Sequence, residues 1–526
     1  MKARGYLTIS VIVIFVILLP IFSILVYSFG GDSDTLRHLL DTVLWGYVYN
    51  TLKLILYVSI LSLVFGISAA YITTFYSFRF DKTISILLAM PFVIPTYIMG
   101  YIYSDIFGFY GPVHMLLKDL GLPTKSYFDV LHFNTIVVIL SLVLYPYIYL
   151  IVKSSFLKNS TALLYPALSL GKNRYQLFWK VILPLSRPAI AGSLALVVME
   201  VVNEYGAVAY YGVDTLSTAI FSSWFGLNDP KSAAFLSIIA MSIILVLLAV
   251  EKLSRGGSSY RSEPISKELV KDELKGIPKV LAYVFLFIPI FFGFVLPFIW
   301  IVIYSFKYAT QMIDDEFLSA IVNSFVSASV SALIIIMLSF FISYSIRISG
   351  SKQAPYLSRV ASMGYAIPGV VIGVGVLTLF GGLDSFLIEL LSLDGLLISG
   401  TVVALIFGYS VRFLAVGIST IEGSYDKVSI NINKASRNLG FGFWKTLWSV
   451  EFPIMKKTLL FGFLLVFVDV IKELPLTLVV RPFNYETLAT KTYDYADNTM
   501  VQESAIYALI IVLLCFIPMI ISNKGD

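Results

Sequence analysis

The chain contains twelve apolar stretches long enough to cross a membrane as helices, arranged in two groups of six. A crossing needs roughly 20 mostly apolar residues to cover about 30 Å of hydrocarbon. Apolar residues make up 58% of the chain and charged residues 13%, with a mean hydropathy of +0.88, which excludes a soluble domain of 526 residues. The sequence therefore predicts an all-α polytopic membrane protein with 12 transmembrane helices. The stretches are 7–27, 54–76, 84–103, 135–152, 189–211 and 233–250, then 280–304, 324–345, 360–380, 396–411, 459–480 and 505–521.

Short motifs occur once in each group, offset by about 270 residues, which indicates two copies of one domain. We assign the first repeat to 1–252, a cytoplasmic linker rich in charge to 253–279 and the second repeat to 280–526. Six crossings per copy is an even number, so the repeats are parallel, and a pathway between them is expected. The paired motifs are Asn50-Thr-Leu with Asn323-Ser-Phe, Ile94-Pro95 and Gly100 with Ile367-Pro368 and Gly373, and Thr215-Leu-x-Thr with Thr487-Leu-x-Thr.

The distribution of Lys and Arg predicts the orientation of the chain. With the N-terminus in the cytoplasm, 28 of the 37 basic residues fall on the cytoplasmic side, including seven between 412 and 457. Cytoplasmic loops of membrane proteins carry such an excess. Both termini are therefore predicted to be cytoplasmic.

Two cytoplasmic segments share a Gly-to-Pro spacing, Gly171 to Pro184 and Gly440 to Pro453. Apolar residues recur at helical spacing within each, so each segment is expected to form a short helix with an apolar face. The Gly allows a turn before this helix, and the Pro is expected to end it before the next crossing. Such a helix either docks in a cleft of a partner or lies under the bilayer. The positions on these faces are Leu177, Phe178 and Val181, and Thr446, Leu447 and Val450.

These segments resemble the coupling loop of ABC importer permeases, which runs Glu-Ala-Ala, three residues, Gly, nine residues, Ile, one residue, Leu-Pro. The acidic position is occupied by Tyr165 and Lys434 in this chain. The resemblance implies the fold of a type I ABC importer transmembrane domain, with coupling helices that contact the ATPase. The implied coupling residues are Ala167, Gly171, Val181, Leu183 and Pro184, and Ala435, Gly440, Val450, Phe452 and Pro453.

No G-x-x-x-x-G-K-[ST] run occurs in the chain, so no phosphate-binding loop is predicted. The resemblance implies that ATP and Mg are bound by separate subunits and that this chain is not itself an enzyme and carries no cofactor. Two coupling loops imply two copies of an ABC ATP-binding subunit on the cytoplasmic side. The family also implies an extracytoplasmic substrate-binding protein and a location in the bacterial inner membrane.

Four carboxylates lie inside predicted crossings, where a charge costs at least roughly 2.5 kcal/mol at the helix centre. Glu200 and Glu204 are four residues apart, as are Asp469 and Glu473, so each pair is expected to share a helix face. If both faces line the axis between the repeats, the four acids form a translocation path that attracts cations. The alternative is that they satisfy polar neighbours, with Lys472 pairing locally.

The stretch from Asp469 through Arg481-Pro-Phe to Thr487-Leu-Ala-Thr resembles the ferric-iron subfamily of fused permeases, as does Asn203-Glu-Tyr-Gly in the first repeat. The resemblance implies import of ferric iron delivered by the binding protein. Thiamine, polyamines or another small solute are alternative substrates of the same machine. A 12-span secondary transporter and a channel are alternatives of other classes, but neither explains the matched loops.

The three histidines, His38, His114 and His132, are far apart in predicted outside segments, where we expect them at the surface. The single Cys515 is expected to pack as a small apolar residue. The sequence therefore predicts no metal site.

Overall fold

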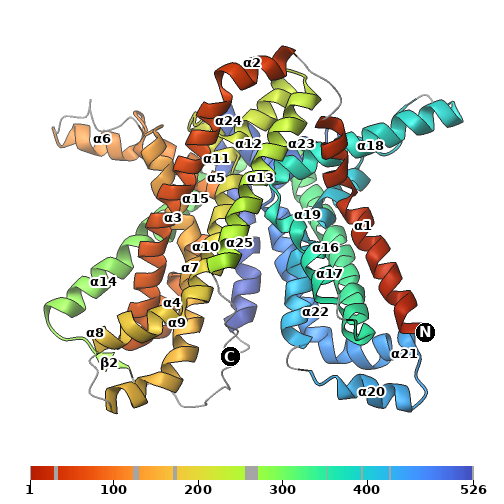
Figure 1. The fold of residues 1–526 in the computed structure, drawn as a ribbon. Coiled ribbons are helices and arrows are strands. Elements are labelled where there is room, and N and C mark those ends of the chain that lie inside the picture. The colour runs from red at the N-terminus through yellow and green to blue at the C-terminus, as the bar shows by residue number, and fades with distance from the viewer. Residues whose placement is uncertain are drawn as a thin grey trace.

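The structure is a computed structural model that describes residues 2–28, 34–121, 130–169, 174–254, 271–351, 354–392, 395–425 and 428–523 (Figure 1). The first repeat comprises α1 (Lys2–Ser28), α2 (Asp34–Thr42), α3 (Leu44–Phe75), β1 (Tyr76–Ser77), α4 (Asp81–Leu87), η1 (Met90–Val93), α5 (Thr96–Phe107), α6 (Pro112–Asp119), α7 (Phe133–Ser169), α8 (Arg174–Leu177), η2 (Phe178–Ile182), α9 (Leu183–Leu185), α10 (Arg187–Asn203), α11 (Gly206–Tyr210), α12 (Leu216–Phe221), η3 (Ser222–Gly226) and α13 (Pro230–Ser254).

The second repeat follows the linker strand β2 (Asp272–Glu273) and has the same succession of long helices, without counterparts of α2 and β1. It comprises α14 (Ile277–Ile290), η4 (Phe291–Val295), α15 (Leu296–Met312), α16 (Asp315–Ser349), α17 (Ala354–Ala361), η5 (Met363–Ala366), α18 (Gly369–Leu391), α19 (Val402–Tyr425), α20 (Asn431–Asn438), α21 (Phe443–Thr446), η6 (Leu447–Glu451), α22 (Phe452–Ile471), α23 (Pro475–Val480), α24 (Leu488–Asp497) and α25 (Val501–Asn523).

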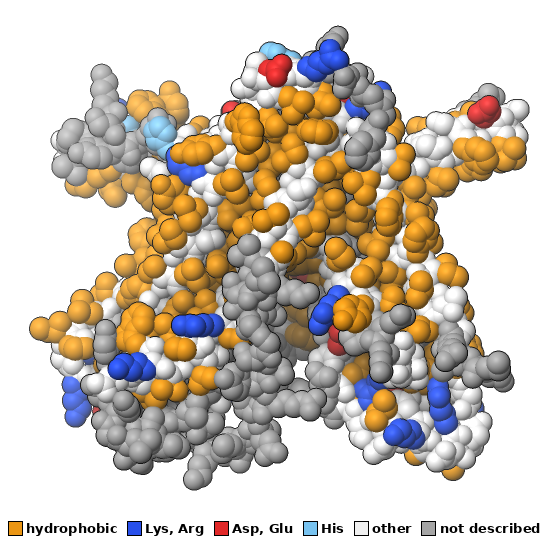
Figure 2. Space-filling model, viewed as in Figure 1, with side chains coloured by type: hydrophobic (Ala, Val, Ile, Leu, Met, Phe, Trp, Pro, Cys, Tyr) orange, Lys and Arg blue, Asp and Glu red, His pale blue; other side chains and the backbone are white. Residues whose placement is uncertain are grey.

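The predicted all-helical membrane architecture is confirmed. Among the described residues, nine helical spans are long and apolar enough to cross a membrane, and two bent helix pairs meet the same requirement together. The remaining predicted crossing is α22, which carries Lys456, Lys457 and Asp469 toward its ends. Figure 2 shows apolar side chains around the middle of the molecule and charged ones mainly at its two ends.

The third crossing of each repeat is broken, which corrects the prediction of continuous helices at 84–103 and 360–380. Pro95 and Pro368 have extended backbones with ψ near 145° and 142°, and the helix restarts after each. A proline disfavours helical geometry at the residue before it, and both Ile94 and Ile367 are extended. In the first repeat the two parts are bent by 92°. The repeated Ile-Pro motif thus marks a repeated break.

The first crossing of each repeat packs against the other repeat. Helix α1 contacts α16 and α18, and Ser23 Oγ donates to the Gly375 carbonyl at 2.8 Å. Helix α15 contacts α5, and Tyr304 donates to Asp105 of that helix. The repeats therefore interlock through exchanged helices.

The two repeats meet at one end of the molecule and diverge toward the other (Figure 1). The diverging end carries α8 and α21, the start of α1 and the end of α25, and we call it the coupling end. Helices α11, α12, α23 and α24 lie at the opposite end.

The described end of the linker is docked on the first repeat. Strands β1 and β2 pair in parallel, with Tyr76 opposite Asp272. Lys271 Nζ donates to the Thr73 carbonyl at 2.8 Å and forms an ion pair with Asp81. These contacts hold this part of the linker beside the start of α4.

Coupling loops and the cavity between the repeats

The second coupling loop begins with a helix C-terminus that requires glycine. Gly440 has φ +82°, and its N–H donates to the Arg437 carbonyl at 2.9 Å. The next N–H, of Phe441, donates to the Ser436 carbonyl at 3.1 Å. This pair of bonds is a Schellman motif, in which a left-handed glycine ends the helix. The predicted turn at Gly440 is confirmed, whereas Gly171 lies outside the described residues.

The prolines do not end the short helices, which corrects that prediction. Pro184 lies in the first turn of α9 and Pro453 in the first turn of α22. Each follows a π-helical segment, in which the N–H of Leu183 or Phe452 bonds five residues back to Phe178 or Leu447. This wider turn accommodates the ring of a proline that lacks an N–H.

The chain bends after Ser186 in the first repeat. The axes of Phe178–Leu185 and Arg187–Asn203 differ by 58°. Pro188 occupies the first turn of α10. The bend in the first repeat thus follows Ser186, two residues after Pro184, where the sequence predicted the short helix to end.

Each coupling helix has a buried apolar face and exposed tryptophans. Leu177 and Phe178 are buried, as are Thr446 and Leu447, and Val181, Leu183, Val450 and Phe452 are half-buried. Trp179 and Trp448 occupy equivalent positions and are 52% and 44% exposed. Trp444, Ala435 and Lys434 are also exposed, and Ala167 lies in α7. The exposed faces are available for contact at the coupling end.

A buried carboxylate that the sequence analysis did not single out holds the second loop together. Glu451 is fully buried and accepts from Asn433 Nδ2 at 2.5 Å. Ser436 and Thr446 hydroxyls lie 2.9 Å apart. Burial raises the pKa of Glu451, and the bond from Asn433 and the charge of Arg347 oppose this. These contacts fasten α20 to the coupling helix.

All four predicted intramembrane acids line one cavity between the repeats. Its volume is about 80 Å³, and its wall includes Glu200, Glu204, Asp469 and Glu473. The wall also includes Lys472, Arg412, Asn203, Tyr147, Tyr365 and Thr96, so both repeats contribute to it. The sequence left this arrangement open as one of two alternatives.

The second acid of each pair lies beyond the end of its helix, which corrects the expectation of a shared helix face. Helix α10 ends at Asn203 and α22 at Ile471. Glu204 Oε1 accepts from the Ala207 N–H at 2.8 Å, and Glu473 Oε1 accepts from the Leu476 N–H at 3.1 Å. Both carboxylates therefore satisfy the N-termini of short helices, α11 and α23.

Glu200 and Asp469 remain on their helices and contact side chains alone. Glu200 Oε1 accepts from Tyr365 at 2.9 Å and from Tyr147 at 3.2 Å. Asp469 pairs with Lys472 at 2.9 Å, the local pairing that the sequence left open as an alternative. The Lys472 ammonium also lies 4.4 Å from the centre of the Phe92 ring.

Arg412 lies at the cavity wall, although the sequence predicted a cytoplasmic position for it. The sequence assigns it to the cytoplasmic basic residues, because the tenth crossing is expected at 396–411. The helix runs instead over Val402–Tyr425, and Arg412 is only 4% exposed. Its Nε lies 3.0 Å from Glu473 Oε2, and its Nη1 donates to Asn203 Oδ1 at 3.0 Å. It thereby joins the two repeats at the cavity wall.

A larger cavity of about 730 Å³ adjoins the first, since Phe92 and Asp469 line both. Its lining includes Lys82, Lys153 and Asp81 of the first repeat and Lys271 of the linker, and also Phe461, Leu465 and Cys515 of the second repeat. Within the part of the chain that the structure describes, no group of three or more His, Cys, Asp or Glu side chains is placed to hold a metal ion. His114 is buried against Phe109, not exposed as predicted.

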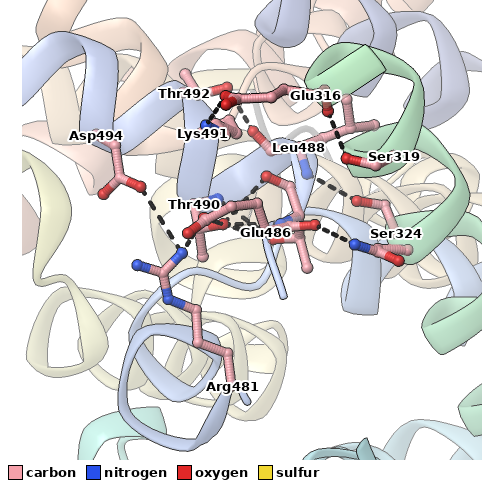
Figure 3. A network of polar contacts seen from close by, with 12 residues as sticks. Glu316, Ser319, Ser324, Arg481, Glu486, Leu488, Thr490, Lys491, Thr492 and Asp494 are labelled. Atoms are coloured by element: carbon pink, nitrogen blue, oxygen red, sulfur yellow. Dashed lines mark hydrogen bonds and ion pairs between the residues drawn. The ribbon is translucent and has the colours of Figure 1, made fainter. Parts of the chain in front are cut away.

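The repeated sequence motifs meet at the end opposite the coupling loops. Asn50 donates to the Asp214 carbonyl at 3.0 Å, and Asn323 donates to that of Glu486 at the same distance. The hydroxyls of Thr51 and Ser324 accept from the N–H groups of Leu216 and Leu488. Thr215 and Thr487 form capping boxes with Thr218 and Thr490. Figure 3 shows the second copy, where Arg481, Glu486 and Asp494 add an ionic cluster.

Two parallel helical repeats, with paired loops at one end and a polar cavity between them, define a two-repeat membrane permease. The family model of binding-protein-dependent transport system inner membrane components matches residues 62–255 and 347–524. The chain belongs to this family.

Several relatives match most of the chain. It is 24% identical to the Fe(3+)-transport system permease protein FbpB 2 of Haemophilus influenzae over 481 residues, 90% of this chain and 89% of the relative. It is also 24% identical to the ferric transport system permease protein FbpB of Actinobacillus pleuropneumoniae, over 86% of this chain and 68% of that protein.

A relative that transports another solute matches a smaller part. The sulfate transport system permease protein CysT of Escherichia coli is 28% identical over 204 residues, 37% of this chain and 71% of that protein. The resemblance to a fused ABC importer permease, most like the ferric-iron subfamily, is confirmed. Membership also favours a permease over the secondary transporter and channel that the sequence left open.

Proposed function

We propose that this chain forms the translocation path for ferric iron in an ATP-driven importer of the bacterial inner membrane. The observation that carries the proposal is the cavity between the repeats, with its four carboxylates at equivalent positions of the two copies. The names of the relatives FbpB 2 and FbpB support iron as the substrate. An extracytoplasmic binding protein would deliver iron at the end opposite the coupling loops.

The charge of the cavity wall favours a cation. When all groups are ionised, four carboxylates face two basic side chains, Arg412 and Lys472. Carboxylate oxygens are ligands suited to hard cations. Because Glu204 and Glu473 cap helices, we assign the contact with the passing ion to Glu200 and Asp469. The iron is substrate here, passing a weakly binding site and leaving it.

Each coupling helix would dock one ABC ATP-binding subunit, so two copies bind one chain. Exposed Trp179 and Trp448 at equivalent positions support two similar docking faces. ATP and Mg would be held by those subunits. The coupling end, with both chain ends beside it, would then face the cytoplasm, in agreement with the distribution of Lys and Arg.

A second substrate class is supported by a different observation. Lys82, Lys153 and Lys271 line the larger cavity together with two carboxylates, those of Asp81 and Asp469, so basic side chains are in excess there. A basic wall suits an anion, and the relative CysT is named for sulfate. Thiamine and polyamines are the alternative substrates that the sequence left open. Both are cations, so the negative charge of the smaller cavity also suits them.

The test is uptake into proteoliposomes that contain the chain, its ATPase and its binding protein. We expect ATP-dependent uptake of labelled ferric iron and none of labelled sulfate. Glu200→Gln combined with Asp469→Asn should reduce iron uptake while ATP hydrolysis continues. Glu389→Gln is the matched control, because Glu389 is exposed on α18 and lies outside the cavity lining.

Two other results would redirect or reject the proposal. Uptake of sulfate, thiamine or a polyamine in place of iron would keep the importer and replace the substrate. Gly171→Glu with Gly440→Glu should abolish ATP-dependent uptake while the chain still reaches the membrane. Full uptake by that double variant would contradict coupling through these loops.

A further inference from the structure

Two helical extensions leave the body of the molecule sideways, one from each repeat. One is α6 with the residues that precede it, and the other is the last part of α18, residues 381–391. Figure 1 places them on opposite sides of the molecule, both toward the end away from the coupling loops. They continue equivalent helices, since α5 and α18 both start after the Ile-Pro break. Neither extension is part of the cavity walls described above.

The extension of α18 is amphipathic. Its first part, Gly369–Val376, is buried in the protein, whereas Leu383, Phe386 and Leu390 are exposed and share one face at helical spacing. Ser385 is exposed on the opposite face, and Glu389 is exposed at the edge of the apolar face. Residues 381–391 span about 16 Å at 1.5 Å per residue, too short to cross a bilayer.

The extension of the first repeat has the same character. Leu116 and Leu120 are 59% and 64% exposed and lie one helical turn apart. Lys118 is exposed on the opposite side of the helix, and exposed Phe109 and Tyr110 precede α6. Tyrosine is enriched where membrane meets water.

The apolar face of the α18 extension is continuous with the surface of the body that faces lipid. Figure 2 shows orange side chains along the underside of the extension of α18, toward the apolar middle of the molecule, with an acidic side chain above them. On the extension of the first repeat, orange side chains lie both above and below the histidine side chains. An apolar face directed to the hydrocarbon and a polar face directed to water is the arrangement of an interfacial helix. Two amphipathic extensions at similar height indicate one common plane.

We propose that α6 and residues 381–391 lie in the membrane-water interface on the side opposite the coupling loops, with Leu116, Leu120, Leu383, Phe386 and Leu390 inserted among lipid chains. The occupant of both apolar faces is therefore the lipid bilayer. Because α5 starts at Thr96 and α18 at Gly369, beside the cavity, the two lipid contacts hold the outer ends of cavity-forming helices at a fixed depth.

The test measures the depth of spin labels in the full chain reconstituted in bilayers. In a Cys515→Ala background, single cysteines replace Phe386 and Leu116 on the apolar faces, and Ser385 and Lys118 on the polar faces as matched controls. We expect oxygen to enhance the relaxation of the spin labels at Phe386→Cys and Leu116→Cys more than a water-soluble nickel complex does. The two controls should show the reverse.

Two outcomes would overturn the proposal. Equal access of the nickel complex to both faces would place the extensions in water. Protection of the apolar labels only after the substrate-binding protein is added would assign these faces to a protein partner. ATP-dependent activity of the labelled chains, compared with the Cys515→Ala parent, verifies that each variant is folded.

Discussion

At the scale of single residues, Arg412 is the clearest link between the repeats. It comes from α19 of the second repeat and contacts Asn203 of the first, while it neutralises Glu473. Removing one partner of a buried ion pair leaves an uncompensated charge and typically costs about 3–5 kcal/mol. We predict that Arg412→Met destabilises the chain by this amount, measured by unfolding in mixed micelles.

Matched variants separate charge from packing at this site. Arg359→Met is the control, because Arg359 is an exposed arginine on α17, and it should change stability little. Adding Glu473→Gln to Arg412→Met should recover part of the loss. Equal stability of Arg412→Met and wild type would show that the ion pair does not contribute.

Asp494 gives a pH dependence whose sign follows from its burial. Burial raises the pKa of Asp494 to about 6, against the opposing charge of Arg481 and with a smaller contribution from Glu486. A carboxylate whose pKa is raised on folding stabilises the folded state below its unfolded pKa and loses that contribution as pH rises through the folded value. Wild type should therefore lose stability between about pH 4 and about pH 7.

The variant Asp494→Asn should flatten this dependence and raise the Tm near neutral pH relative to wild type. Thermal unfolding across the same pH range measures the effect, with Glu389→Gln as a control that keeps the wild-type profile. An unchanged slope in Asp494→Asn would assign the pH dependence to other groups.

At the scale of elements, the sequence predicted what repeats along the chain and missed what depends on contacts between distant segments. The Gly-to-Pro spacing predicted two short helices with an apolar face, because a turn residue and the spacing of apolar residues are local features. It did not predict that the π-helical segments η2 and η6 would carry each helix past its proline. Arg412 was misplaced because a buried arginine is possible only when a carboxylate from another segment, Glu473, meets it.

For the four acids, the sequence indicated the equivalence between the repeats but not the local backbone structure. Their equivalent positions in the two repeats suggested a common path as one of two alternatives, and the structure has all four at one cavity. Helical spacing alone could not show that α10 ends before Glu204 and α22 before Glu473, because the short helices that these carboxylates cap become visible only in three dimensions. The breaks at Pro95 and Pro368 were hidden for a similar reason, since apolar stretches on both sides read as one crossing.

Gly440 allows a prediction at this scale. At φ +82° a side chain is strained although a Cβ added there would meet nothing within 4 Å, so Gly440→Ala acts through the backbone alone. Left-handed geometry costs an L-residue roughly 1–2 kcal/mol. We expect about tenfold weaker binding of the ATPase subunit, measured by titration in nanodiscs.

Gly442 provides the matched control two residues away. It has φ −75° and equally open surroundings, so Gly442→Ala should bind the ATPase subunit like wild type. If both variants bind equally well, the turn at Gly440 does not orient the coupling helix.

At the scale of the whole molecule, the arrangement of the repeats predicts how they move. They meet at the end opposite the coupling loops and diverge at the coupling end, with about 730 Å³ open between them. The exchanged helices α1 and α15 tie each repeat to the other, so relative rotation, not separation, is the motion that keeps these contacts. Docking of two ATPase subunits that approach each other on binding ATP would then close the coupling end.

Spin labels at Lys180→Cys and Ser449→Cys, equivalent exposed positions of the two coupling helices, measure this closure in a Cys515→Ala background. We predict that the distance between them shortens when the assembled transporter binds a non-hydrolysable ATP analogue. Labels at Asp41→Cys and Asp315→Cys, exposed at the opposite end, should not shorten, because the repeats already meet there. Shortening at both ends would indicate uniform compaction, and no change at either would mean that the coupling loops do not transmit nucleotide binding to the cavity.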